Sequence, residues 1–340
     1  MPSTQQPVRP SRPSSGRGSV QGRRVVPTKK QRRRGTTSID RMLRPWWQSP
    51  WMLGGGGLAA VAVVIAIVVI VINVVSPAAV FTAQPVSASV LTAVTSPSQS
   101  ALSQVGSGGS AVGINSGDPA GEIVKVKNTT TLTSGGKPEV IFVGAEYCPY
   151  CAAERWAIVT ALSRFGTFSG LQEMVSSPSD VYPSTHTFTF KNATYSSSYI
   201  DFSSTELFSN VPDSNSGTGY APLQTPSSQV SSIFSTYGAS PYQNDGSGVV
   251  ESYPFLDIAN RFTIYSVQYS PQILQGLDWQ QIASDLSNPQ SQVAKAIIGS
   301  ANYLTAAICV TTSNQPSGVC SSSAIQSLES TLSSETAVGS

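Results

Sequence analysis

Histidine and cysteine are scarce in this chain of 340 residues, which has one histidine, His186, and four cysteines. A zinc site usually takes four ligands, and its cysteines and histidines recur at short, recognisable spacings. Only Cys148 and Cys151 are spaced in this way. We therefore predict no metal centre and no other cofactor, and we interpret His186 as a residue on the surface of a sheet.

Charged residues are absent between Arg44 and Asp118. Residues 1–50 carry 12 Lys+Arg and one Asp, whereas the rest of the chain carries 8 Lys+Arg and 17 Asp+Glu. The charge-free stretch holds the one long apolar run, Leu58–Val75, in which Asn73 is the only polar residue. Together with the residues before it, this run is long enough to cross a hydrocarbon core of ~30 Å. We predict a single transmembrane helix over residues 51–76.

The basic segment 1–50 has few apolar residues to bury, so we expect a disordered tail. Nucleic acid or anionic lipid could bind such a tail, but the adjoining span explains it better. The positive-inside rule places it in the cytoplasm and the rest of the chain outside the cell membrane, and we expect no nucleic-acid partner. A cleaved signal peptide is the competing interpretation, although its apolar and basic regions would be shorter.

Beyond the span we expect a tether over residues 77–85 and one exported domain over residues 86–340. Within the domain, Ser96 is a candidate cap for a short helix that starts at Pro97 and ends at Gly106. Residues 203–248 are rich in Ser, Asn, Gly and Pro and are predicted to be an insertion with one short helix near residues 230–237.

A buried strand is predicted to turn into a helix at the first pair of cysteines. Residues 140–143, Val-Ile-Phe-Val, are apolar on both faces, which is typical of a central strand covered on both sides. The sequence after them predicts a helix that has Pro149 in its first turn and ends near Gly166. Further predicted elements are strands in GLQEMV, THTFTF and SYIDF, a hairpin of YPFLDI and FTIYSV, and helices in DWQQIASDL, with Asp278 as N-cap, and in PQSQVAKAIIGSANYLTAAIC.

The spacing Cys-Pro-Tyr-Cys at residues 148–151 is compatible with a redox couple, half of a metal site or a structural disulfide. An exported location and the start of a helix favour the redox couple, because the N–H groups and dipole of the helix stabilise a thiolate at Cys148. Cys148 is expected to be exposed, and Cys151, one turn into the helix and more covered, would be the resolving thiol. Cys309 and Cys320 enclose turn-forming residues and are predicted to form a structural disulfide, which contributes about 3 kcal/mol.

The segment VIFVGAEYCPYCAAERW resembles the thioredoxin superfamily: an apolar strand, Cys, two residues, Cys, then a helix. This segment, YPFLDIANRF, LQGLDWQQIASDL and the late cysteine pair together are similar to a prokaryotic family of membrane-anchored, thioredoxin-like proteins, catalogued as domain of unknown function 929. The resemblance covers residues from about 85 to 325. It implies an α/β, thioredoxin-like fold with a polar insertion and extra C-terminal helices, preceded by one transmembrane helix.

The resemblance also implies roles for residues away from the cysteines. Pro254 matches the cis-proline that faces the cysteine pair in thioredoxin-like proteins, and substrate contacts are expected from Tyr147, Pro149, Tyr150 and Tyr253. Phe142 stands where thioredoxins have a buried Asp. The proton of Cys151 would therefore leave to water or to Glu146.

We otherwise interpret three charged residues near the cysteines as surface charges, namely Glu146, Glu154 and Arg155. The predicted function is a membrane-anchored, extracytoplasmic thiol–disulfide oxidoreductase. Its partners would be the thiols or disulfides of exported proteins and a redox partner in the membrane. The alternative is a binding or structural module of the same fold that keeps a permanent Cys148–Cys151 disulfide.

Overall fold

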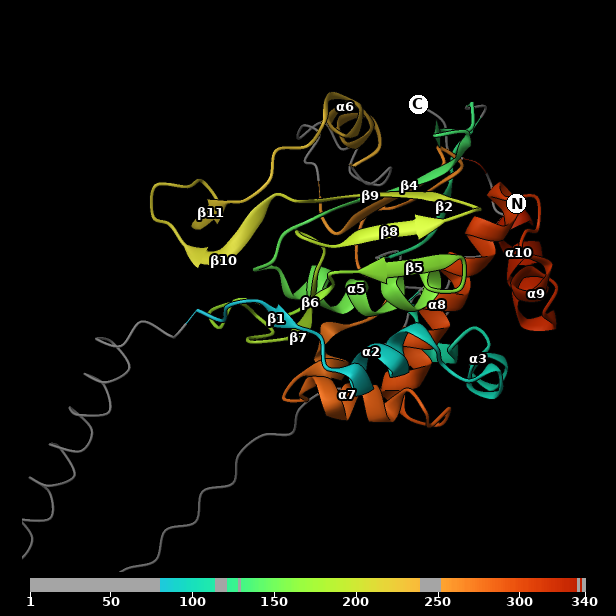
Figure 1. Cartoon of the computed structure of the whole chain (residues 1–340), viewed down its shortest axis with the longest axis horizontal. Coiled ribbons are helices and arrows are strands. Elements are labelled where there is room, and N and C mark those ends of the chain that lie inside the picture. The colour runs from blue at the N-terminus through green and yellow to red at the C-terminus, as the bar shows by residue number, and fades with distance from the viewer. Residues whose placement is uncertain (1–79, 114–120, 128–129, 239–251, 335–336, 338–340) are drawn as a thin grey trace, which may run out of the picture. The chain divides into compact units, whose positions relative to one another are not determined.

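The structure is a computed structural model of the full chain, and it describes residues 80–113, 121–127, 130–238, 252–334 and 337. The predicted cytoplasmic tail (1–50), the predicted transmembrane helix (51–76) and the start of the predicted tether lie outside the described residues. The described part is a mixed α/β structure with several sheets and eight α-helices (Figure 1).

Strand β4 (Lys137–Gly144) is the centre of a six-stranded mixed sheet. On one side it pairs antiparallel with β12 (Phe255–Ile258), and on the other it pairs parallel with β9 (Asp201–Glu206). The sheet is completed by β13 (Phe262–Ile264), which forms the predicted hairpin with β12, by β2 (Val124–Lys125), and by β3 (Thr133–Ser134), which pairs with the start of β4.

Both faces of β4 are covered, as its unbroken apolar run predicts. Val140 and Phe142 pack into the main core with helices α5 (Pro149–Leu162) and α8 (Gln292–Thr311). Ile141 and Val143 pack on the opposite face with helix α6 (Ser228–Tyr237). Figure 1 shows α6 on one side of the central sheet and α5 and α8 on the other.

Helix α5 begins directly after Cys148, and Pro149 is its first residue. The helix ends at Leu162 with Ser163 as its C-cap, so the prediction that Gly166 ends it is wrong. Gly166 instead starts β5 (Gly166–Ser169), which pairs with β8 (Thr194–Ser197). A Cβ at Gly166 would lie 2.4 Å from the backbone oxygen of Ser196. The glycine is therefore needed for the close approach of these two strands.

A separate three-stranded sheet has the order β1-β6-β7. Strands β6 (Gln172–Val175) and β7 (His186–Thr189) were predicted, whereas β1 (Gln84–Pro85) uses the last residues of the predicted tether. The strand predicted in SYIDF begins later, at Asp201, and continues as β9 into the predicted insertion. The rest of the described insertion forms the hairpin of β10 (Phe208–Pro212) and β11 (Tyr220–Pro222), followed by helix α6.

Within residues 80–113, two α-helices precede the central sheet, where one was predicted. Helix α2 (Ala88–Thr95) has Ser96 as its C-cap, and helix α3 (Gln99–Val105) is capped at its N-terminus by the Ser98 side chain. The prediction of Ser96 as the N-cap is therefore wrong. The N-cap is Ser98, the second serine of the Ser-Pro-Ser sequence at residues 96–98. Gly106 ends α3 with a φ of 56°, as predicted. A short 3-10 helix, η3 (Gly109–Ala111), follows.

The C-terminal part begins with the 3-10 helix η4 (Pro271–Leu274) and with α7 (Trp279–Asp285), for which Asp278 is the N-cap, as predicted. The long helix α8 then packs against α5, α3 and α10. The last two helices, α9 (Ser317–Cys320) and α10 (Ser323–Ser334), were not predicted.

Among the described residues, α8 has the length and apolar composition of a membrane-spanning helix, but 89% of its apolar window is buried inside the fold. It is packed as a core helix.

Candidate functional site

Cys148 and Cys151 lie where the central strand β4 turns into helix α5. Cys148 is the N-cap residue of α5, and its Sγ accepts a hydrogen bond from the backbone N–H of Cys151 at 3.3 Å. The first N–H groups of a helix have no partner within the helix and need an acceptor outside it. Here the acceptor is a thiol sulfur, and both cysteines are free thiols.

Both sulfurs are covered. Cys148 is 6% exposed and Cys151 is 0% exposed, and they form a small apolar cluster with Ala145. Tyr147, Phe208 and Tyr253 pack against this cluster. The expectation that Cys148 is exposed is therefore wrong, because side chains that are remote in the sequence cover it. The order of burial is as predicted, with Cys151 more covered than Cys148.

The surroundings act in opposite directions on the two thiols. Hydrogen bonding from the Cys151 side chain, assisted by the Cys151 N–H and the positive charge of Arg155, lowers the pKa of Cys148 in spite of its burial. Burial raises the pKa of Cys151 well above its ordinary value, and the neighbouring Cys148 raises it further. Of the pair, Cys148 is the thiol that ionises first.

Tyrosines surround the pair of cysteines. The ring of Tyr147 stacks on Tyr220 of β11 at a centroid distance of 4.0 Å, and its hydroxyl lies 2.6 Å from the hydroxyl of Tyr253. Tyr150, between the two cysteines, is 37% exposed and meets the ring of Tyr182 edge-on. The predicted insertion thus reaches the site, since Phe208 and Tyr220 belong to its hairpin.

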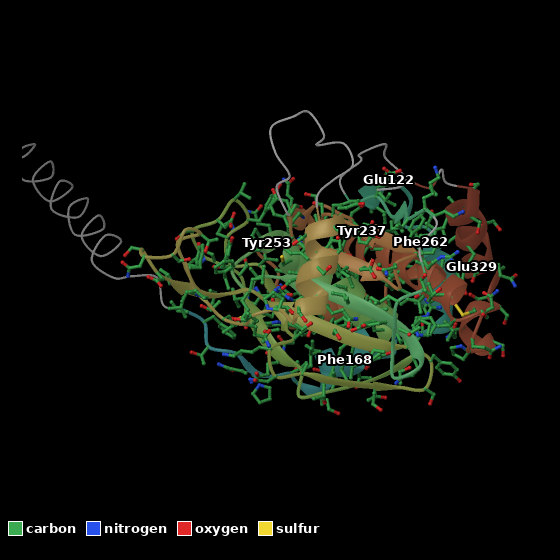
Figure 2. The ribbon with its side chains drawn as sticks, turned by 90° about the horizontal axis from the view of Figure 1, so that it is seen from above. Glu122, Phe168, Tyr237, Tyr253, Phe262 and Glu329 are labelled. Carbon is green, nitrogen blue, oxygen red and sulfur yellow. A yellow bond between two sulfur atoms is a disulfide. The ribbon has the colours of Figure 1, made fainter. Side chains whose placement is uncertain are left out.

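Pro254 lies at the same end of the sheet as the cysteines. The Tyr253–Pro254 peptide bond is cis, as the resemblance predicted. The next residue, Phe255, opens β12 and pairs with Val143 of β4, two residues before Ala145 in the cysteine cluster. Tyr253 itself packs against that cluster, and Figure 2 labels its position. The structure therefore brings Tyr253 to Tyr147 and the Cys148–Cys151 segment, from which it is separated by about a hundred residues in the sequence.

The three charged residues predicted to lie on the surface are all buried. Glu146 is 3% exposed, and Glu154 and Arg155 are 0% exposed. Arg155 forms an ion pair with Glu206 at the end of β9, with an Nη2–Oε2 distance of 2.6 Å. The prediction failed because the partners come from segments that are distant in the sequence. The helical spacing of Cys151 and Arg155, four residues apart, is the one signal that could have placed Arg155 near the site.

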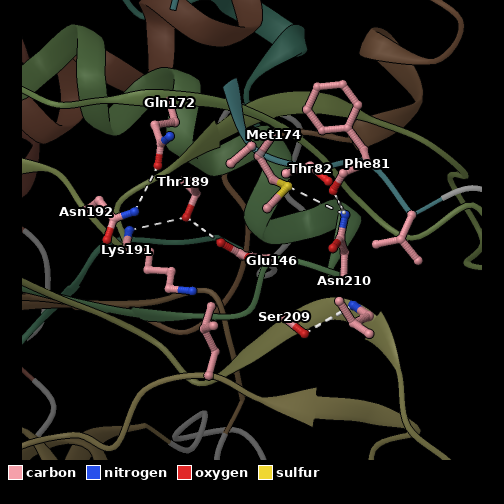
Figure 3. Close-up of a pocket in the computed structure, with 14 residues that line it drawn as sticks. Phe81, Thr82, Glu146, Gln172, Met174, Thr189, Lys191, Asn192, Ser209 and Asn210 are labelled. Atoms are coloured by element: carbon pink, nitrogen blue, oxygen red, sulfur yellow. Dashed lines mark hydrogen bonds between the residues drawn. The ribbon is translucent and has the colours of Figure 1, made fainter. Parts of the chain in front are cut away.

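Glu146 borders a pocket of about 410 Å³ between β10, the β6–β7 sheet and residues 80–83 (Figure 3). Its Oε1 accepts a hydrogen bond from the hydroxyl of Thr189 at 2.7 Å, and Lys191 lies nearby. Burial raises the pKa of Glu146, and the charge of Glu206 adds to the effect. Glu146 therefore lines this pocket with a carboxyl group that is itself almost completely covered.

The other predicted residues lie apart from this site. Cys309 and Cys320 form a disulfide with a Cα–Cα distance of 5.6 Å, which joins the end of α8 to α9. The carboxylate of Glu329 in α10 lies close to these sulfurs, but both sulfurs are already bonded to each other. Figure 2 shows the disulfide near Glu329 and well separated from Tyr253. His186 is a half-buried residue of β7 whose ring meets Trp279 edge-on.

The family model described as Domain of unknown function (DUF929) matches residues 122–310, more than half of the chain. This match spans β4, the two cysteines, Pro254 and most of α8. No curated protein and no solved structure matches the chain.

Proposed function

We propose that this chain, a member of the DUF929 family, is a membrane-anchored thiol–disulfide oxidoreductase that exchanges disulfides with exported proteins through Cys148 and Cys151. One observation carries the proposal: a thiol caps the start of α5, accepts an N–H hydrogen bond, and has a second, fully buried thiol one turn behind it. A helix start is where a thiolate is stabilised, and a second thiol within reach can resolve a mixed disulfide.

We also propose that the central part is a thioredoxin-like fold. The arguments for it are the order strand, Cys-x-x-Cys, helix in β4 and α5, the parallel partner β9, and the β12–β13 hairpin that begins next to the cysteines. The hairpin β10–β11, helix α6 and the C-terminal helices would then be additions to that fold.

The exchange proceeds in two balanced steps. The Cys148 thiolate attacks one sulfur of a substrate disulfide, a Cys148–substrate disulfide forms, and the other substrate sulfur leaves as a thiolate. Cys151 then loses its proton to water or to Glu146 and attacks the Cys148 sulfur, which releases the second substrate thiolate. In total, two electrons pass to the substrate and the two cysteines become a disulfide. The reverse sequence oxidises a substrate dithiol, and a dithiol or disulfide protein of the membrane restores the starting state.

Substrate contacts are proposed for the residues around the sulfurs. Tyr150 is the exposed member of this group, and Pro149 and Tyr147 flank Cys148 in the chain. Tyr253 precedes β12 and packs on the cysteine cluster, so its backbone is placed to pair with an extended substrate segment. Because Cys148 is only 6% exposed, a substrate sulfur has to approach between these rings.

The proposed location is supported by the sequence. The basic segment 1–50 and the apolar run Leu58–Val75 support an anchor with its N-terminus in the cytoplasm and the domain outside. The disulfide Cys309–Cys320 is consistent with an oxidising compartment.

The Cys151→Ser variant tests the function. Without the resolving thiol, attack by Cys148 continues but the mixed disulfide persists, so covalent adducts with exported proteins should accumulate in cells and disappear on reduction. The matched controls are Cys148→Ser and the double variant, both of which should yield no adducts. If Cys151→Ser traps no protein and the purified full-length chain neither oxidises nor reduces a model dithiol, the function is instead that of a binding or structural module.

A further inference from the structure

A buried ion pair lies directly behind the cysteine site. Arg155 and Glu206 both have 0% exposed side chains. The Nε and Nη2 atoms of Arg155 donate to the two carboxylate oxygens of Glu206 at 3.0 and 2.6 Å. Glu206 also accepts the backbone N–H of Phe190. Burying two charges costs several kcal/mol per ion, so such a pair is weak evidence for a purely stabilising role.

The guanidinium of Arg155 is linked to the Cys148 loop through one carbonyl group. Its Nη2 donates to the backbone oxygen of Ala145 at 2.8 Å, and the N–H of Cys148 donates to the same oxygen at 3.3 Å. The guanidinium also lies over the ring of Phe142, at 5.6 Å from the ring centre. A Cβ built on Gly144 would lie 2.4 Å from that ring and 3.3 Å from Cys151 Sγ. The ring of Phe142 and the sulfur of Cys151 therefore lie on the same side of Gly144, close to each other.

The hydrogen bonding of the Arg155 guanidinium is incomplete. Nη1 of Arg155 is buried and has no hydrogen-bond partner in the described part of the chain. The carboxylate of Glu206 binds the other two nitrogens. In a medium of low dielectric constant, the unbonded edge of a buried guanidinium acts strongly on its neighbours. The neighbours on which Arg155 acts here are the sulfurs of Cys148 and Cys151.

We propose that Arg155 is a positioning residue whose buried charge favours the thiolate form of Cys148, and that Glu206 moderates this effect. The inference rests on the proposed function, since it concerns the same reaction. Stabilising the thiolate stabilises the reduced pair, which makes the pair a stronger oxidant. Arg155 thus biases the exchange toward oxidation of exported dithiols.

Five titratable groups of the described residues act on Cys148 or share its cluster: Cys151, Arg155, Tyr147, Tyr150 and Tyr253. Burial raises the pKa of each of the three tyrosines, so they are neutral at pH 5 to 8. The charge that acts on the thiols is therefore that of Arg155, and Glu146, whose pKa is raised by burial, is a further carboxyl that interacts with Arg155.

The test compares charge variants by the pH profile of Cys148 alkylation in the reduced full-length protein, with the Cys309–Cys320 disulfide intact. Arg155→Met/Glu206→Met removes both charges and keeps the site apolar. Its alkylation by iodoacetamide should be about tenfold slower at pH 6 and equal to wild type at pH 9.5, which corresponds to a rise of one unit in the pKa of Cys148. Its equilibrium with glutathione should shift about tenfold toward the disulfide form, or by about 30 mV.

The single variant Glu206→Gln separates electrostatics from structure. It leaves the Arg155 charge uncompensated, so alkylation at pH 6 should become faster than in wild type, opposite to the double variant. A purely structural pair would loosen the site and speed alkylation at every pH in both variants. If Arg155→Met/Glu206→Met does not fold, the Glu206→Gln profile decides alone. Profiles that overlay wild type in the folded variants would refute the role of Arg155.

Glu154→Gln is the matched control, because Glu154 precedes Arg155 in the same helix and is equally buried but binds Gln268. It should leave the profile of Cys148 unchanged. The wild-type protein keeps the two proposals distinguishable. If wild-type Cys148 exchanges disulfides while all profiles overlay, only the role of Arg155 fails. If wild-type Cys148 exchanges none, the proposed function fails.

Discussion

Replacing Glu154 by Gln should make the stability of the domain less dependent on pH. Glu154 is fully buried in α5. Its Oε2 accepts the N–H of Gln268 at 2.9 Å, and its Oε1 has no hydrogen-bond partner among the residues that the structure describes. Burial raises the pKa of Glu154 from 4.5 to about 8, against the opposing effect of the Gln268 hydrogen bond.

The sign and size follow from the linkage between proton binding and folding. The folded state binds the Glu154 proton more tightly than the unfolded state does, so protonation of Glu154 stabilises the fold. This contribution to the free energy of unfolding is complete below pH 4.5 and is lost as the pH rises toward 8. The loss is about 1.4 kcal/mol per pH unit, or at most about 4 kcal/mol between pH 5 and 8. A neutral amide has the same shape and no such loss. Relative to wild type, Glu154→Gln should therefore gain about 1 to 4 kcal/mol over this range.

The assay is urea unfolding of the full-length protein at pH 5, 6, 7 and 8. The control is Glu139→Gln on β4, where both carboxylate oxygens already accept hydrogen bonds, from Ser203 and Gln229. That amide cannot satisfy both donors, so the control should be less stable than wild type at pH 8. A difference between Glu154→Gln and wild type that does not change with pH would refute the reasoning.

Three further changes have expected outcomes. Tyr253→Phe removes the hydroxyl that is hydrogen-bonded to Tyr147 and should lower the free energy of unfolding by about 1 kcal/mol. The loosened rings should let iodoacetamide reach Cys148 several-fold faster, and an unchanged rate would contradict the role of Tyr253 in covering Cys148. Cys309→Ser/Cys320→Ser should lower the free energy of unfolding by about 3 kcal/mol without altering Cys148 alkylation, as measured by mass spectrometry. Asp278→Ala removes the capping box of α7 and should cost about 1 kcal/mol in urea unfolding; Gln280→Ala on the same helix is its control and should be nearly neutral.

Local patterns made part of this structure predictable. Four successive apolar residues predicted that β4 is covered on both faces, and the Cys-Pro-Tyr-Cys sequence after it predicted the start of α5. Asp278 before an apolar periodic segment predicted the cap of α7. In each case the signal and its structural consequence lie within a few residues of each other, so tertiary contacts had little to override.

What the sequence did not predict depends on contacts between distant segments. Arg155 is buried because Glu206, 51 residues away, neutralises it, and a charged residue on a helix is otherwise expected in water. Cys148 is covered because Phe208 and Tyr253 pack against its cluster. The N-cap of α3 was misassigned because the Ser-Pro-Ser sequence before it offers two serines as caps, and only the tertiary context decides which of them begins the helix.

The most direct test of the central claim is a redox titration of the Cys148–Cys151 pair in glutathione buffers. The account predicts one two-electron transition, at a potential between about −270 and −120 mV, the range of catalytic pairs. Cys309–Cys320 should remain oxidised throughout this range, because the reduction potentials of structural disulfides lie below about −300 mV. A Cys148–Cys151 disulfide that stays oxidised in the same buffers, together with Cys309–Cys320, would contradict the account and identify the pair as a permanent structural disulfide.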